Sequence, residues 1–241
     1  MTSRIRIGTA GWSVPAPNAA DFPAEGSHLE RYAARFDAVE INSSFHRPHR
    51  RATYARWAAS VPDDFRFSAK LPRTITHDRR LIDCDEPLRR FADEISGLGD
   101  KLGVLLVQLP PTLLFEADVV SAFFAALRSL SDAALACEPR HDSWFAEDAG
   151  AALAAMKIAR VAADPARTPA AALPGGSPLL RYVRLHGSPV IYRSAYGEER
   201  LRAYAAMLHA AGGADSWCIF DNTASMAATG DALLLQRIVA P

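Results

Sequence analysis

The chain has 241 residues, 49% of them hydrophobic, which is enough for one large core and close to the roughly 250 residues of a single (β/α)8 barrel. Acidic and basic residues number 27 each, so the bulk charge indicates neither a nucleic-acid partner nor an anionic membrane surface. Three scattered cysteines argue against a disulfide framework, and the first residues contain no long apolar segment, so we expect a cytoplasmic protein with no signal peptide and no membrane contact.

Hydrophobic periodicity predicts an α/β fold with eight strands, most of them followed by a helix. The strands are expected at residues 5–9, 38–42, 65–70, 102–109, 133–138, 158–164, 182–187 and 217–222. Helices are expected at residues 28–36, 53–60, 87–95, 116–130, 144–156, 198–211 and 225–239. Residues 165–178 are rich in Ala, Pro and Gly and lack a helical period, so the helix between strands six and seven should be degraded. We therefore predict one TIM-barrel domain over residues 1–241.

The second predicted strand indicates which side chains point toward the barrel axis. Val39 and Ile41 alternate with Glu40 and Asn42. In a barrel covered by helices the apolar face should contact the helices, so Glu40 and Asn42 are expected to point inward near the carboxyl end of the strand.

The stretch 133–144 gives the clearest indication of a site, because an apolar strand ends abruptly on charged and aromatic side chains. Lys70 ends the third strand, and Tyr182, Arg184 and His186 share one face of the seventh. TIM-barrel enzymes place their active sites at the carboxyl ends of the strands. We therefore predict that catalysis is carried by four residues at these ends: Glu40, Lys70, Glu138 and His186. The residues expected to position the ligand are Asn42, Arg73, Arg140, His141, Gly187 and Asn222.

The cationic side chains among these candidates would give one rim of the barrel a local positive charge, which predicts a small anionic ligand, with a phosphorylated metabolite as one option. In this hypothesis Glu40 or Glu138 acts as general base, and Lys70 or His186 acts as acid or electrophile. Hydrolysis, isomerisation and lyase chemistry all stay open. Since the first Gly-rich turn matches neither the dinucleotide pattern nor the Walker pattern, no cofactor is predicted.

The sequence is also compatible with two other functions for this pocket. Glu40, Glu138 and Asp221 offer carboxylate ligands for a divalent metal, which would suit a phosphate or phosphodiester hydrolase acting even on nucleic acid, although no compact motif such as H-x-H occurs. The other alternative is a non-catalytic module that binds a small ligand in the same pocket.

Several short motifs, in order along almost the whole chain, resemble the YecE-like family, known as domain of unknown function 72. They are G-T-A-G-W at 8–12, V-E-I-N-S-S-F at 39–45, K-L-P-R at 70–73, T-H at 76–77, Q-L-P-P at 108–111, E-P-R-H-D-S-W at 138–144, R-L-H-G at 184–187 and F-D-N at 220–222. His46 and Asp221 depart from the family pattern, which tends to have tyrosine and asparagine there. The resemblance implies a TIM-barrel fold and a family without an established activity.

Overall fold

The computed structural model describes residues 4–210 and 212–240, and it is an α/β fold in which parallel strand pairs dominate. One sheet has the strand order β1-β10-β9-β7 and is parallel throughout. Its strands are β1 (Ile5–Thr9), β7 (Ala162–Asp164), β9 (Leu180–Leu185) and β10 (Asp215–Phe220). Every expected strand of this sheet is therefore present, within two residues of its predicted ends for β1, β9 and β10.

The second sheet has the order β2-β3-β4-β5-β6-β8. Its strands are β2 (Ala38–Ile41), β3 (Arg66–Lys70), β4 (Leu102–Gln108), β5 (Ala134–Glu138), β6 (Ile158–Arg160) and β8 (Gly175–Gly176). Only β8 runs antiparallel to its neighbour. A side chain on Gly176 would meet the backbone oxygen of Ile158, because a Cβ would lie 2.4 Å from it, so this short strand requires glycine.

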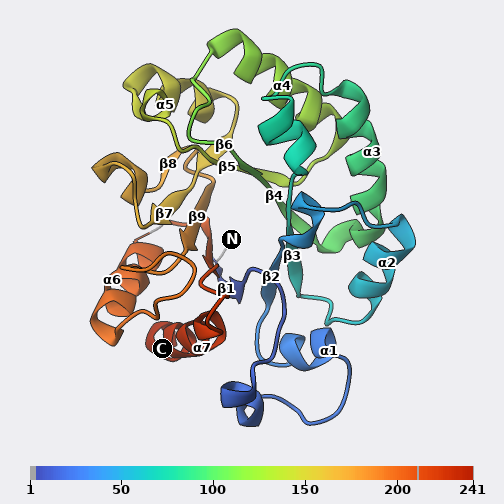
Figure 1. The fold of residues 1–241 in the computed structure, drawn as a ribbon, viewed down its shortest axis with the longest axis vertical. Coiled ribbons are helices and arrows are strands. Elements are labelled where there is room, and N and C mark those ends of the chain that lie inside the picture. The colour runs from blue at the N-terminus through green and yellow to red at the C-terminus, as the bar shows by residue number, and fades with distance from the viewer. Residues whose placement is uncertain (1–3, 211, 241) are drawn as a thin grey trace.

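Seven α-helices occur in the described part of the chain: α1 (His28–Ala33), α2 (Arg51–Ala59), α3 (Asp85–Ile95), α4 (Ala117–Leu130), α5 (Glu147–Ala155), α6 (Glu198–His209) and α7 (Ala227–Val239). Figure 1 places the strands of both sheets around a common centre, with the helices on the outside. No helix among the described residues is long and apolar enough to cross a membrane.

The structure differs from the sequence prediction in a few places. The expected sixth strand is divided at Val161 into β6 and β7, which belong to different sheets. The helix expected from residue 144 begins at Glu147, because Asp142–Phe145 form a 3-10 turn capped by the His141 side chain. As predicted, residues 165–178 contain no α-helix, only the 3-10 turn Pro169–Ala172 and β8. The predicted end of α6 at Ala211 lies outside the described residues.

Alternation along the strands explains where the polar residues gather. The inner face of the strands is apolar toward their amino ends, where Leu106, Ala136, Tyr182 and Ile219 belong to one small buried cluster. Two residues further along each strand the same face becomes polar, at Gln108, Glu138, Arg184 and Asp221, and all four side chains are buried. The carboxyl ends of the strands therefore bring charged side chains together above an apolar floor.

Candidate functional site

Arg184, in β9, is the centre of the buried charged cluster. Its side chain has no exposed surface, and its guanidinium bonds to three carboxylates. Nη2 donates to Glu40 Oε1 at 2.7 Å and to Asp221 Oδ2 at 3.0 Å, and Nη1 donates to Glu138 Oε2 at 2.5 Å. Although burial alone would lower the pKa of Arg184, the three carboxylates hold it well above its usual value. Arg184 therefore keeps its charge in spite of its burial.

Glu40, at the centre of β2, is held at both carboxylate oxygens. Besides its bond from Arg184 Nη2, Oε2 accepts from Arg184 Nε at 3.0 Å and from the Tyr182 hydroxyl at 3.0 Å. The Tyr182 hydroxyl also lies 2.9 Å from Ser68 Oγ. Glu40 has no exposed surface. This carboxylate consequently lies beneath Arg184, where a ligand cannot touch it.

His186 lies between two acidic side chains, immediately after β9. Its Nε2 is 3.1 Å from Glu138 Oε1, and its Nδ1 is 3.0 Å from Asp221 Oδ2. Burial lowers the pKa of His186, but Glu138 and Asp221 outweigh burial and raise the net value above 6.5. In turn, although burial opposes ionisation of Glu138, Arg184 and His186 hold its pKa well below the usual range. A carboxylate with a lowered pKa is a weak base, and the two acidic neighbours favour the charged form of the His186 imidazole.

Lys70, the last residue of β3, is the one cation of this group with no ion pair among the described residues. Its side chain is only 6% exposed, and its ammonium lies 4.2 Å from the centre of the Phe45 ring. Burial and the neighbouring charge of Arg184 lower the pKa of Lys70 from 10.5 to about 8. The carboxylates nearby are already taken by Arg184. Lys70 is therefore a buried cation that contacts an aromatic ring and pairs with no carboxylate of the described residues.

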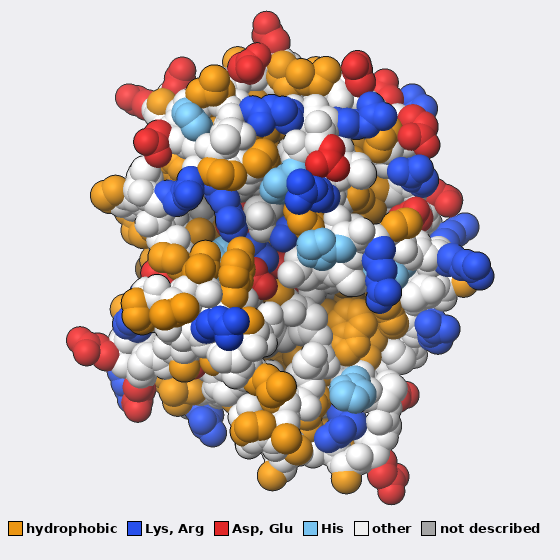
Figure 2. All heavy atoms as spheres, viewed as in Figure 1, with side chains coloured by type: hydrophobic (Ala, Val, Ile, Leu, Met, Phe, Trp, Pro, Cys, Tyr) orange, Lys and Arg blue, Asp and Glu red, His pale blue; other side chains and the backbone are white. Residues whose placement is uncertain are grey.

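A cavity of about 160 Å³ adjoins the cluster on the side of β5, β7 and β9. Glu138, Arg140 and His186 line it, and so does Arg167 from the loop after β7. Arg140 Nη2 donates to Glu138 Oε1 at 3.0 Å. On the face drawn in Figure 2, Lys, Arg and His side chains gather near the middle, where Figure 1 shows the centre of the strand arrangement. Glu138 and His186 therefore face a cavity as well as the packed cluster.

A second network holds the loop after β9 in place. The Gly187 amide donates to the Tyr196 hydroxyl at 2.9 Å, and that hydroxyl donates to Asp164 Oδ2 at 2.7 Å. Asn222 Nδ2 donates to Asp231 Oδ2 at 2.7 Å. Gly187 has a φ of +93°, and a Cβ there would lie 2.9 Å from the Ser194 oxygen. Gly187 and Asn222, both expected to contact a ligand, are therefore engaged in shaping this loop.

The structure brings some of the predicted residues together and leaves others apart. Glu40, Lys70, Glu138, Arg140 and His186 converge on the cluster. Arg73 does not, because its largely exposed side chain pairs with Asp78 in its own loop at 3.2 Å. His141 accepts the Ser143 amide at 3.2 Å and so caps a local turn.

Sequence reasoning missed Arg184 and Tyr182 as members of the site. The available signal was the period-two face that both share with His186 in the seventh predicted strand. Arg167 was also missed, because it lies in a loop that has no regular pattern.

The residues present do not fit the metal alternative. Glu40, Glu138 and Asp221 do meet at one point, but the Arg184 guanidinium stands there and bonds to all three. A divalent cation would have to displace the buried Arg184 guanidinium, which already pairs with all three carboxylates that would bind the metal. No group of three His, Cys, Asp or Glu side chains in the described residues is arranged to hold a metal ion.

Comparisons with known proteins give a family but no activity. The model of the family "Protein of unknown function DUF72" matches residues 6–241. The UPF0759 protein YecE of Escherichia coli is 34% identical over 120 residues, which cover 49% of this chain and 43% of YecE, so the match spans less than half of that relative.

Two solved structures of DUF72 proteins resemble this chain along nearly its whole length. The protein from Enterococcus faecalis has a TM-score of 0.81 at 20% identity and covers 98% of this chain and 95% of its own. The protein from Thermotoga maritima has a TM-score of 0.79 at 23% identity, with 98% of each chain covered. At such identities these likenesses show the fold alone. With a family model matched from residue 6 to residue 241, the chain belongs to the family of unknown function DUF72.

Proposed function

We propose that the cluster around Arg184 is the active site of an enzyme that acts on a small anionic substrate by acid/base catalysis. The observation that carries the proposal is Lys70, a buried ammonium at the carboxyl end of a strand that pairs with no carboxylate in the described part of the chain. A buried cation is costly unless it meets a negative group. In this proposal a substrate phosphate or carboxylate supplies that group, and Arg140 and Arg167, which line the cavity beside Glu138 and His186, add positive charge nearby.

The acid and base roles follow from the state of each group. With a pKa of about 8, Lys70 is largely protonated near neutral pH, so its ammonium binds the anionic group and can serve as acid. His186, whose pKa is raised, serves as the second acid. Glu138 and Asp221 keep the imidazole protonated and oriented, and Glu40 keeps Arg184 in place. Glu40 and Glu138 are thus positioning residues in this proposal and not the general base.

The proposal includes one closed (β/α)8 barrel as the frame of the site. Two observations support closure of the two sheets into one ring. At one junction, Ala10 forms a parallel β-bridge with Glu40. There the Gly11 backbone amide donates to the backbone carbonyl oxygen of Glu40 at 2.8 Å. At the other, β6 and β7 follow each other directly, with only Val161 between them. Since Arg184 of one sheet pairs with Glu40 and Glu138 of the other, we propose that the described residues, 4–210 and 212–240, act as one domain.

A thermal-shift titration with inorganic phosphate, sugar phosphates and simple carboxylates tests the proposal. The variants are Lys70→Met, which removes the charge at similar volume, and Lys157→Met as the control at an exposed lysine. An anion at 100 times its dissociation constant adds about 2.7 kcal/mol, which raises the Tm of a chain this size by about 5 to 10 °C.

The expected result is an anion-dependent rise in the wild type and in Lys157→Met that is lost in Lys70→Met. A rise of the same size in Lys70→Met would contradict the proposal. If the anion binds but an assay of the same compounds detects no product, the site is a binding module. Divalent metals are titrated in parallel, and a stabilisation by metal alone, retained in Lys70→Met, would favour the hydrolase alternative instead.

A further inference from the structure

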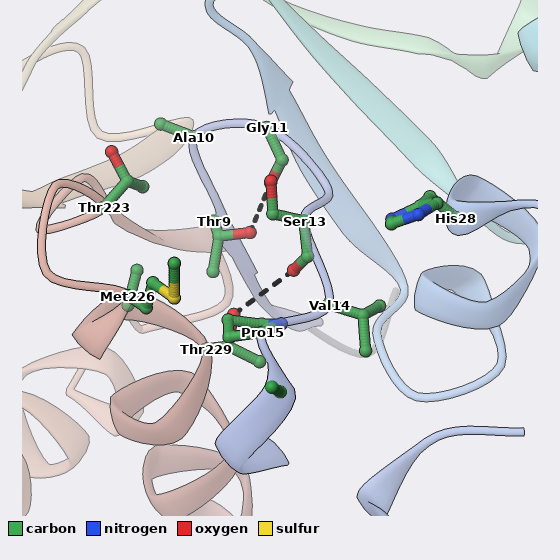
Figure 3. A pocket seen from close by; sticks show the side chains of 12 residues that line it. Thr9, Ala10, Gly11, Ser13, Val14, Pro15, His28, Thr223, Met226 and Thr229 are labelled. Atoms are coloured by element: carbon green, nitrogen blue, oxygen red, sulfur yellow. Dashed lines mark hydrogen bonds between the residues drawn. The ribbon is translucent and has the colours of Figure 1, made fainter. Parts of the chain in front are cut away.

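A groove larger than the cavity at the cluster runs across the loop that follows β1. It consists of two cavities, of about 510 and 380 Å³, that share Ala10, Gly11, Ser13 and His28; we call it the Gly11 groove. In Figure 3, Thr223 and Met226 lie on one side of this loop and His28 lies on the other. Gly11 leaves the groove open, because nothing lies within 4 Å of the place a Cβ would take. The loop after β1 therefore lines the groove and leaves space at Gly11.

The smaller half of the groove has an aromatic wall. Trp12 and Trp57 lie edge to face, with ring centres 4.9 Å apart, and His49 packs on Trp57 at 5.1 Å. All three side chains are half-buried and line the cavity. Aromatic walls of this kind bind planar rings by stacking.

The polar groups of the groove favour a ring that carries hydrogen-bond donors and no positive charge. Asn42 Oδ1 is buried and has no hydrogen-bond partner, and Asn42 lines the smaller half. Among the described residues no carboxylate lines either half, whereas His28, Arg47 and His49 line the smaller half. A donor on the ligand would satisfy the Asn42 oxygen.

The groove and the candidate active site are joined by one short turn. Asn42 and Ser43 line the groove, and Phe45 of the same 3-10 turn (Ser43–Phe45) lies under the Lys70 ammonium. Asn42 and Phe45 are therefore about 6 Å apart along this turn. One end of this turn therefore lines the groove, and the other end contacts the Lys70 side chain.

We propose that the Gly11 groove binds the heteroaromatic ring of the substrate, and that the substrate class is a nucleoside monophosphate whose phosphate meets Lys70. This inference rests on the proposed function for the phosphate, but the ring site depends only on the groove.

The test compares AMP with ribose 5-phosphate, which lacks the base, and with adenosine, which lacks the phosphate. Binding is measured by calorimetry and by tryptophan fluorescence, because Trp12 and Trp57 line the groove while Trp144 and Trp217 are buried. The full chain is used as wild type, Trp57→Leu, Trp57→Phe as the variant that keeps a ring, and Asn42→Ala in case Trp57→Leu fails to fold.

The wild type should bind AMP about tenfold or more tightly than ribose 5-phosphate and lose fluorescence on binding. Trp57→Leu and Asn42→Ala should reduce this advantage without changing the affinity for ribose 5-phosphate, and Trp57→Phe should retain most of it. Equal affinity for the two compounds, or an advantage that persists in Trp57→Leu and Asn42→Ala, would overturn the groove assignment while leaving the phosphate site intact. Binding of adenosine and AMP with equal affinity would support the ring site and overturn the phosphate site. Binding of none of the three would overturn both.

Discussion

Burial of the charged Lys70 side chain lowers the free energy of unfolding by an amount that can be measured. A decrease of its pKa from 10.5 to about 8 corresponds to about 3 kcal/mol of lost stability at neutral pH. Because the folded pKa lies below the unfolded one, the cost is complete below pH 8 and disappears as the pH rises from about 8 to about 10.5. The variant Lys70→Met, which carries no charge, should therefore be more stable than the wild type at pH 7, and the difference should shrink at pH 10.

Urea unfolding of wild type, Lys70→Met and the control Lys157→Met at both pH values checks this expectation, since the comparison removes the effect of other groups that titrate above pH 9. A difference between wild type and Lys70→Met that is the same at pH 7 and pH 10 would show that the pKa of Lys70 is not lowered.

Only part of the candidate site could be predicted from the sequence. Lys70, Glu138 and His186 could be predicted to converge, because the carboxyl ends of parallel strands meet at one end of a barrel. Arg184 could not be identified as the centre, since its position depends on three carboxylates from distant parts of the chain. The local partners of Arg73 and His141 could not be predicted either, because hydrophobic periodicity says nothing about where a side chain in a loop points.

Among the elements, the start of the loop after β9 is held by a hydroxyl that bonds to two groups. Tyr196 Oη accepts from the Gly187 amide and donates to Asp164. In Tyr196→Phe the Gly187 amide loses its partner, and the loss of a buried hydrogen bond costs about 1 to 3 kcal/mol. We expect its hydrogen exchange to become about tenfold faster or more, while the Leu185 amide, within β9, keeps its rate.

Hydrogen exchange followed by NMR distinguishes these amides. Unchanged exchange at Gly187 would mean that other contacts hold the loop. Equal acceleration at both amides would mean that the substitution loosens β9 itself.

Most boundaries of strands and helices could be predicted from the sequence, because the apolar residues that face the core recur at the spacing typical of each element. The division of the sixth strand at Val161 did not, since it depends on which neighbour each half can pair with: β6 pairs with β5, and β7 pairs with β9. The antiparallel β8 was also missed, because two glycines in a loop carry no strand pattern.

In the whole molecule, the buried ion pairs join the two sheets. Arg184 of β9 reaches Glu40 of β2 and Glu138 of β5, so its loss would leave carboxylates of both sheets buried and uncompensated. We expect Arg184→Met to lower the free energy of unfolding by about 3 to 5 kcal/mol. Arg202→Met removes only an exposed pair with Glu198 and should cost less than about 0.5 kcal/mol.

Urea unfolding measured by circular dichroism compares the two variants. Equal losses for Arg184→Met and Arg202→Met would show that the cluster does not hold the sheets together. If Arg184→Met does not fold at all, Glu40→Gln, which weakens one arm of the cluster, should still be clearly less stable than wild type.

The most direct test of an anion site at Lys70 uses the small number of lysines in the chain, which are Lys70, Lys101 and Lys157. Protein with isotope-labelled lysine side chains gives three signals by NMR, and Lys70→Met assigns one of them. The wild type should show one lysine titrating at a pKa of about 8, and saturating inorganic phosphate should raise that pKa and shift that signal alone. A Lys70 signal that titrates near 10.5, or that phosphate shifts no more than the exposed Lys157, would contradict the account.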